Sequence, residues 1–136
     1  MKKKPTVSKL KKKLDAVFSK YIRLRRSFIK DDERVCTCVT CGNTNIVKKM
    51  QNGHFMSRKY TSTRFSEENC NVQCIACNRF DQGRQYEHYL YIDSFYGEGT
   101  SEKLHKLSRV KKTFKVDELQ NAIKYYKAKV DNIEQA

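Results

Sequence analysis

Two pairs of cysteines limit what this chain can fold into. Cys38 and Cys41 are separated by two residues, and Cys74 and Cys77 repeat the same spacing. Two such pairs are typical of four thiolates around one tetrahedral zinc ion. The chain must then fold so that the two ends of the segment 42–73 lie close together.

Two other cysteines, Cys36 and Cys70, are rival ligands. Their spacings to Cys41 and Cys74 fit a zinc site less well than the two C-x2-C pairs, so we expect them to be small buried hydrophobic side chains. With four protein ligands the zinc would be structural, since it keeps no open position for chemistry. Only 38% of the 136 residues are hydrophobic, and a core this thin benefits from a structural metal.

The net charge of +14 points to a polyanionic partner, and nucleic acid is the commonest one. The alternatives are a solubilising excess of charge, a membrane surface or an acidic protein. No apolar run approaches the roughly 20 residues that span a bilayer, and no apolar segment of a signal peptide follows the basic start at 1–5. We therefore expect a cytoplasmic protein that does not enter a membrane and whose thiols stay reduced.

Apolar side chains at steps of three and four predict an amphipathic helix over 6–35. Its opposite face is basic and includes Lys20 and Arg23, which either follow phosphates or are simply solvated. The apolar stripe consists of Val7, Leu10, Leu14, Val17, Phe18, Tyr21, Leu24 and Phe28.

A hairpin is expected where two short apolar runs, Ile46-Val47 and His54-Phe55-Met56, flank the turn signal Asn52-Gly53. The following residues 57–73 are polar and irregular, which is typical of a functional loop.

Three helices are expected in the second half of the chain. One opens near 74–77, bends at Gly83 and ends at Gly97. A short helix starts at Thr100 or Ser101, with Leu104 and Leu107 pointing inward, and a last helix covers about 116–133.

Three polar residues between and beside the cysteine pairs are candidates for chemistry. Taken alone, a histidine flanked by glycine and phenylalanine, as His54 is, is more often a structural residue than a catalytic one. Its companions make it more notable, because Asn69 lies five residues before Cys74 and Asn78 directly follows Cys77. His88 and His105 lie outside this series, and we expect them to be ordinary helix residues.

The series His54, Asn69 and Asn78 resembles that of the HNH, or ββα-metal, endonucleases, and the ending Cys-x-x-Cys-Asn is similar to that of the junction-resolving endonuclease VII. Several motifs in order also resemble the phage NinG (Rap) recombination proteins, over roughly residues 7–133. These motifs are Ser19-Lys20-Tyr21-Ile22-Arg23-Leu24-Arg25, Cys38-x-x-Cys41-Gly42, Gly53-His54-Phe55, Arg64-Phe65-x-x-x-Asn69, Gln73-Cys74-x-x-Cys77-Asn78 and Gly83.

The resemblance implies a single domain over 1–136 with an α+β, mostly α, fold. A zinc-stabilised ββα-metal centre, HNH- or endonuclease VII-like, would occupy 36–97. The basic helix 6–35 and the C-terminal helices in 98–136 would flank it.

The resemblance also implies a structure-selective endonuclease of phage recombination that hydrolyses branched DNA, such as Holliday junctions or D-loops, in the cytoplasm of the host cell. His54 would be the general base, Asn69 would orient its loop, and Asn78 would help to hold Mg²⁺. Symmetric resolution of a junction would need two active sites, so a homodimer is attractive.

The magnesium ligand set is incomplete in the sequence. Many HNH enzymes carry an acidic residue or a histidine just before the base, where this chain has Gly53. Glu67, Glu68 or Asp81 could complete the set, or His54 could itself be a ligand.

Basic residues surround the proposed centre. They would grip phosphate and neutralise the charge of the transition state, unless they form a merely solvated loop. They are Arg58, Lys59, Arg64 and Arg79.

Six tyrosines could stack on unpaired bases, although packing is the more ordinary role for them. They are Tyr86, Tyr89, Tyr91, Tyr96, Tyr125 and Tyr126.

The main alternative to an enzyme is a non-catalytic, zinc-containing DNA-binding accessory protein of recombination, which would use the same basic surface. A zinc-knuckle adaptor that binds another protein fits the charge poorly.

Overall fold

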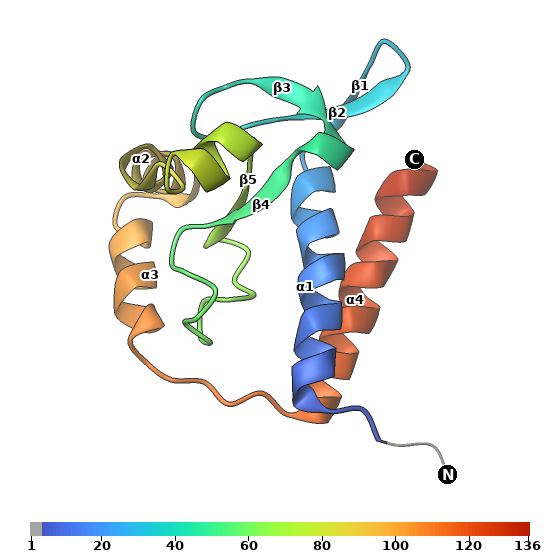
Figure 1. Ribbon diagram of the computed structural model, residues 1–136, viewed down its shortest axis with the longest axis vertical. Coiled ribbons are helices and arrows are strands. Elements are labelled where there is room, and N and C mark those ends of the chain that lie inside the picture. Colours follow the sequence, from blue (N-terminus) through green and yellow to red (C-terminus); the bar gives the residue numbers. More distant parts are fainter. Residues whose placement is uncertain (1–3) are drawn as a thin grey trace.

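The computed structural model describes residues 4–136, so the predicted basic start of the chain lies partly outside the described residues. The fold is α+β, as predicted, with a three-stranded antiparallel sheet in the order β1-β2-β3 and a separate β4-β5 pair (Figure 1). The elements are α1 (Val7–Leu24), β1 (Phe28–Lys30), β2 (Glu33–Thr37), β3 (Thr44–Ile46), η1 (Val47–Lys49), β4 (Gln51–His54), β5 (Cys70–Gln73), η2 (Ala76–Phe80), α2 (Gln85–Tyr96), α3 (Thr100–Ser108) and α4 (Val116–Gln135).

The first helix is shorter than the prediction of 6–35. The Thr6 hydroxyl caps α1 by accepting a hydrogen bond from the Lys9 backbone N–H, and α1 ends at Leu24. The chain then forms the β1-β2 hairpin, whose two-residue turn places Asp31 and Asp32 at φ 51° and 63°. Positive φ at both central residues is the geometry of a tight hairpin turn, so local turn chemistry overrides the helical spacing.

The hairpin predicted over 46–56 is wrong. Asn52 and Gly53 form no turn but lie inside β4, where they pair with Val72 and Asn71 of β5. The connection between these strands is the long segment 55–69. The structure therefore uses Gly53 for its lack of a side chain rather than for a turn.

The helices of the second half follow the prediction closely. Gln82, Gly83 and Arg84 all have positive φ, which separates the π-helical turn η2 from α2 at the predicted bend. α2 ends at Gly97, and α4 covers the predicted range. In α3, Leu104 is buried, but the expected inward position of Leu107 is wrong, since its side chain is 44% exposed.

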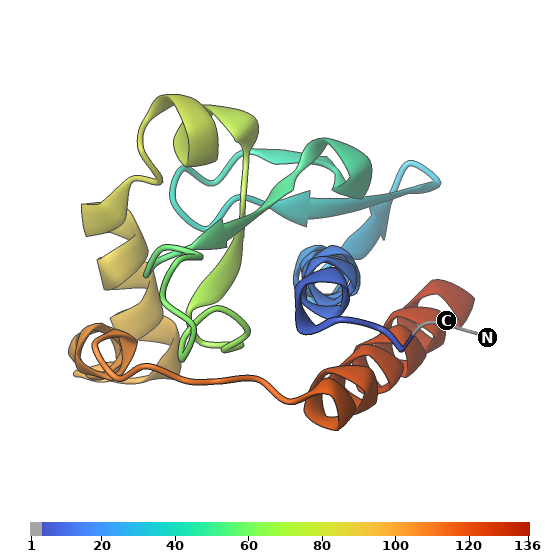
Figure 2. The same ribbon diagram turned by 60° about the horizontal axis from the view of Figure 1, so that its bottom comes forward.

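The two long helices α1 and α4 lie side by side and run in the same direction (Figures 1 and 2). Leu119 near the start of α4 packs with Leu10 and Leu14 of α1, whereas Val130 near its end packs with Leu24. α1 therefore lies between α4 and the strands, and its apolar stripe is core, as expected, except for Phe28, which is exposed in β1. None of the helices that the structure describes is long and apolar enough to cross a membrane.

We predict that Leu119→Ala lowers the free energy of unfolding by about 2–5 kcal/mol, because it leaves a cavity between α1 and α4. The exposed Leu107 provides a matched control, and Leu107→Ala is expected to change stability by less than about 0.5 kcal/mol. Urea denaturation of both variants checks this difference. Equal losses would contradict the packing described here.

Candidate functional site

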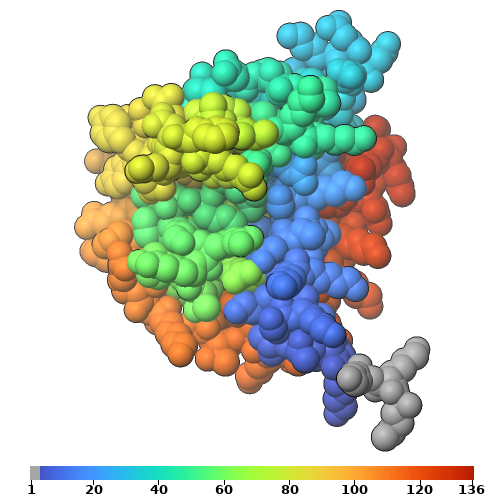
Figure 3. Space-filling model, viewed as in Figure 1, coloured from blue at the N-terminus to red at the C-terminus, as the bar shows by residue number. Residues whose placement is uncertain are grey.

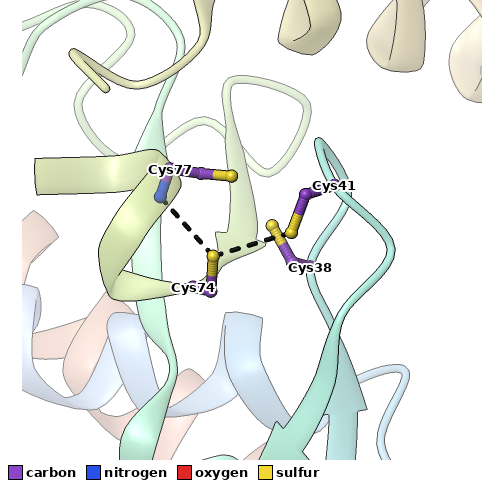
Figure 4. A group of neighbouring side chains, drawn as sticks. All are labelled: Cys38, Cys41, Cys74 and Cys77. Carbon is purple, nitrogen blue, oxygen red and sulfur yellow. Dashed lines mark hydrogen bonds between the residues drawn. The ribbon is translucent and has the colours of Figure 1, made fainter. Parts of the chain in front are cut away.

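The four cysteines of the two pairs converge, as predicted (Figure 4). Cys38 and Cys41 come from the turn after β2, Cys74 directly follows β5, and Cys77 lies in η2. Their sulfur atoms all lie within 4.8 Å of one another, with Cys41 Sγ 3.6 Å from Cys74 Sγ. A tetrahedral zinc with Zn–S bonds of about 2.3 Å needs sulfur atoms about 3.8 Å apart. The cluster could therefore hold a zinc ion.

The electrostatics of the cluster favour a cation. Although burial raises the pKa of Cys38, hydrogen bonds from the Thr40 hydroxyl and from backbone N–H groups lower it to about 6. Burial raises the pKa of Cys77. Thiols this close cannot all ionise side by side, whereas a divalent cation stabilises four thiolates together. Cys36 and Cys70 are buried outside the cluster, as predicted.

A groove of about 600 Å³ lies beside the cysteine cluster. The three segments that line it, from α1, from β4 and its following loop, and from η2, meet on the face shown in Figure 3. The lining residues are Asp15, Ser19, Arg23, Met50, Gln51, Asn52, His54, Arg58, Asn78 and Arg79. His54 and Asn78 are thus brought together, and Asn69 is not among the lining residues.

His54 ends β4 and is held in one tautomer. Its Nε2 lies 3.0 Å from the carbonyl oxygen of Arg64. A carbonyl oxygen only accepts, so Nε2 carries the proton and Nδ1 keeps its lone pair. Burial lowers the pKa of His54, while the hydrogen bond to the Arg64 carbonyl and, less strongly, Asp15 partly oppose this change. The imidazole is therefore neutral near pH 7 and able to take a proton.

Asn69 is fully buried behind the loop that follows His54. Its Oδ1 accepts a hydrogen bond from Met56 N at 2.7 Å, and its Nδ2 donates to the carbonyl oxygens of Met56 and Thr63, both at 3.1 Å. The orienting role expected for Asn69 stays a prediction, and these hydrogen bonds are the means by which it would be exerted.

Asn78 joins the cysteine cluster to the groove. Its backbone N–H donates to the carbonyl oxygen of Cys74, and its side-chain Nδ2 donates to Gln51 Oε1 at 2.8 Å. This second hydrogen bond uses the amide nitrogen, so Oδ1 remains as an acceptor. An amide oxygen is a hard ligand of the kind that Mg²⁺ accepts.

Gly53 explains the absence of an acidic residue just before His54. A Cβ atom at this position would lie 1.9 Å from Gln73 Oε1 and 2.6 Å from its Cδ. Gln73 is buried and cannot easily move, because its Nε2 donates to the carbonyl oxygen of Gly83 at 2.8 Å and to the hydroxyl of Thr40 at 3.1 Å. No side chain fits at position 53 in this arrangement.

Asp15 is a residue of the groove that the motif analysis missed. Both of its carboxylate oxygens accept hydrogen bonds from the Arg64 side chain, and Arg58 lies 4.0 Å away. Asp15 belongs to α1, far from the motif in sequence. One signal in the sequence could have identified Asp15, because it is the one acidic residue of the basic helix α1.

The acidic residues suggested as magnesium ligands lie elsewhere. Glu67 accepts hydrogen bonds from the hydroxyl groups of Tyr21 and Tyr126 and is not among the groove-lining residues. Glu68 and Asp81 do not line the groove either. Among the described residues that line it, Asp15 is the only carboxylate.

The basic residues predicted to grip phosphate divide into two groups. Arg23, Arg58 and Arg79 line the groove. The other three are placed differently: the Arg64 side chain pairs with Asp15, Lys20 pairs with Glu134 at 3.2 Å, and Lys59 lies over the ring of Tyr60.

His88 is not the ordinary helix residue that we expected. Its side chain is fully buried, with Nε2 3.1 Å from Asn71 Nδ2, and burial lowers its pKa to about 4. His105 is an exposed residue of α3, as predicted. Tyr86 is 71% exposed, so the packing role expected for the tyrosines does not hold there.

The fold and this site define a small, basic α+β protein in which a four-cysteine cluster that could hold a zinc ion lies beside a polar groove. A family model described as Bacteriophage Lambda NinG protein matches residues 1–136. The chain therefore belongs to the NinG family of phage recombination proteins. No curated protein and no solved structure matches it significantly.

We predict that Cys74→Ser abolishes zinc binding and leaves the chain largely unfolded, because the free energy of metal binding contributes to folding. Cys36→Ala is the matched control, since Cys36 is buried but outside the cluster, and it should keep one zinc ion per chain. Elemental analysis and circular dichroism check both variants. A folded, zinc-free wild-type protein would refute the metal centre.

We predict that Gly53→Ala lowers the free energy of unfolding by about 1–3 kcal/mol through its clash with Gln73. In a Gln73→Ala background the same substitution should cost clearly less, because the clashing atoms are gone. A double-mutant cycle in urea measures this coupling. Additive effects of the two substitutions would show that Gln73 is not what excludes a side chain at position 53.

Proposed function

We propose that this protein is a structure-selective DNA endonuclease of phage recombination, which hydrolyses phosphodiesters of branched DNA with a divalent metal. The observation that carries the proposal is the arrangement of His54. Its Nε2 is tied to the Arg64 carbonyl, which leaves the basic Nδ1 available in a groove lined by arginines and Asn78.

The chemistry needs a base, a grip on phosphate and an ordered loop. His54 Nδ1 would take a proton from the attacking water, which suits a neutral imidazole. Arg58 and Arg79 would hold the phosphate and neutralise charge as it develops. Asn69 would keep the loop after His54 in place through its bonds to Met56 and Thr63.

The oxygen atoms of the groove fit a hard divalent cation. Asn78 would hold Mg²⁺ through Oδ1, and Asp15 is the carboxylate that could take the place of the acidic residue that Gly53 excludes. When bound, the ion would polarise the scissile phosphate and stabilise the negative charge of the transition state.

The charge and the family support branched DNA as the substrate. A net charge of +14 favours sequence-independent contacts to phosphates, and the NinG family belongs to phage recombination. Symmetric cutting of a four-way junction requires two grooves, so the proposal includes a homodimer on the DNA.

One observation favours the alternative, a non-catalytic DNA-binding accessory protein. The Asp15 carboxylate is already paired with Arg64, which reduces its attraction for a cation. The cleavage experiment below distinguishes the two functions directly, because the accessory protein would bind junctions without cutting them.

We predict that His54→Ala reduces cleavage of a labelled four-way junction by about 10²–10⁴-fold, the usual contribution of a general base. Binding of the junction and zinc content should stay near wild type, because phosphate contacts are spread over many lysines and arginines. Single-turnover cleavage with Mg²⁺ and fluorescence anisotropy without it measure the two properties.

His105→Ala is the matched control, since His105 is an exposed histidine outside the groove, and it should cleave like wild type. Equal cleavage by His54→Ala and wild type would remove His54 from the active site. A wild-type protein that binds junctions but never cuts them would favour the accessory function.

A further inference from the structure

Phe80 is the most exposed large hydrophobic side chain among the described residues, with 82% of its surface accessible. A single exposed apolar residue is common on protein surfaces. Phe80, however, belongs to the same π-helical turn as Asn78 and Arg79, which line the groove. Ile75, just before this turn, is also exposed. An apolar surface thus adjoins the site where phosphate would be held.

The turn that carries Phe80, Ala76–Phe80, contains Cys77 of the cysteine cluster. The segment after it is closed onto the turn, because the Gly83 backbone N–H donates to the Cys77 carbonyl at 2.8 Å. The Gly83 carbonyl in turn accepts a hydrogen bond from the buried Gln73. The backbone that carries Phe80 is therefore already ordered, so binding through this side chain costs little backbone conformational entropy.

The charge around Phe80 indicates what it would contact. Arg79 precedes it, and Arg23 and Arg58 line the same groove, so a nucleic-acid strand is the complementary partner. In an intact duplex, every internal base is covered by neighbours on both faces. At a branch point a base can lose one neighbour, and its exposed face can stack on an aromatic side chain.

We propose that Phe80 stacks on a base exposed at the branch point of DNA and thereby gives the protein a preference for branched over linear DNA. This inference deepens the proposed function, since it names the feature of the substrate that the same groove recognises. It is tested by binding alone, so it can succeed or fail independently of cleavage.

The experiment compares the dissociation constants of a four-way junction and of a linear duplex with the same arm sequences. Anisotropy is measured without added Mg²⁺ for wild type, Phe80→Ala, Phe80→Trp and Phe28→Ala. Phe28 is a matched control, because it is 46% exposed in β1 and does not line the groove. Zinc content and circular dichroism confirm that each variant is folded.

Phe80→Ala should weaken junction binding by about five- to 150-fold, the range measured for loss of one base–aromatic stack, and leave duplex binding unchanged. Phe80→Trp should restore junction binding, and Phe28→Ala should bind both DNAs like wild type. Equal weakening for junction and duplex, or no change for either, would overturn the inference, and the second result would leave this surface to a protein partner. If the wild-type protein does not cleave the junction, the proposed endonuclease activity is contradicted, but the stacking of Phe80 is not.

Discussion

The structure depends on the meeting of two short chain segments at the cysteine cluster. The turn after β2 brings Cys38 and Cys41, and the segment from the residue after β5 into η2 brings Cys74 and Cys77. Because both ends of the intervening segment 42–73 are fixed there, its strand β4 can pair with β5, and the long loop between them needs little core of its own. The cluster also sets the position of η2, and with it Asn78. In a chain with a small apolar fraction, a metal at this point would replace much of the stabilisation that larger domains obtain from packing.

The sequence predicted those features that follow from fixed spacing. The two C-x2-C pairs predicted the cluster, and the spacing of apolar residues predicted α4 and most of α1. Gly97 marked the end of α2 correctly. These signals are local, because one residue type at one interval decides the outcome.

The end of α1 was missed for a local reason, the tight turn at Asp31-Asp32, whereas the other main failures involve contacts between distant segments. Asn52-Gly53 is a turn signal by itself, but both residues pair with β5, and the missing side chain of Gly53 leaves room for Gln73. Asp15 reaches the groove only because α1 packs beside β4, and no motif contains it. His88 is buried against Asn71 of β5, which its own helix gives no sign of.

The close contact between Gly53 and Gln73 limits where a carboxylate of the groove can come from. Since Gln73 leaves no room for a side chain at position 53, a carboxylate there would also require a substitution at position 73. Either substitution alone would give a less stable protein. Asp15 of α1 supplies a carboxylate to the groove without any change at positions 53 and 73. A fragment with the cysteine cluster and β4-β5 alone would keep His54 and Asn78 but lack Asp15, the one carboxylate among the described residues that line the groove. Under the proposed function, the N-terminal helix would then be part of the active site as well as of the core.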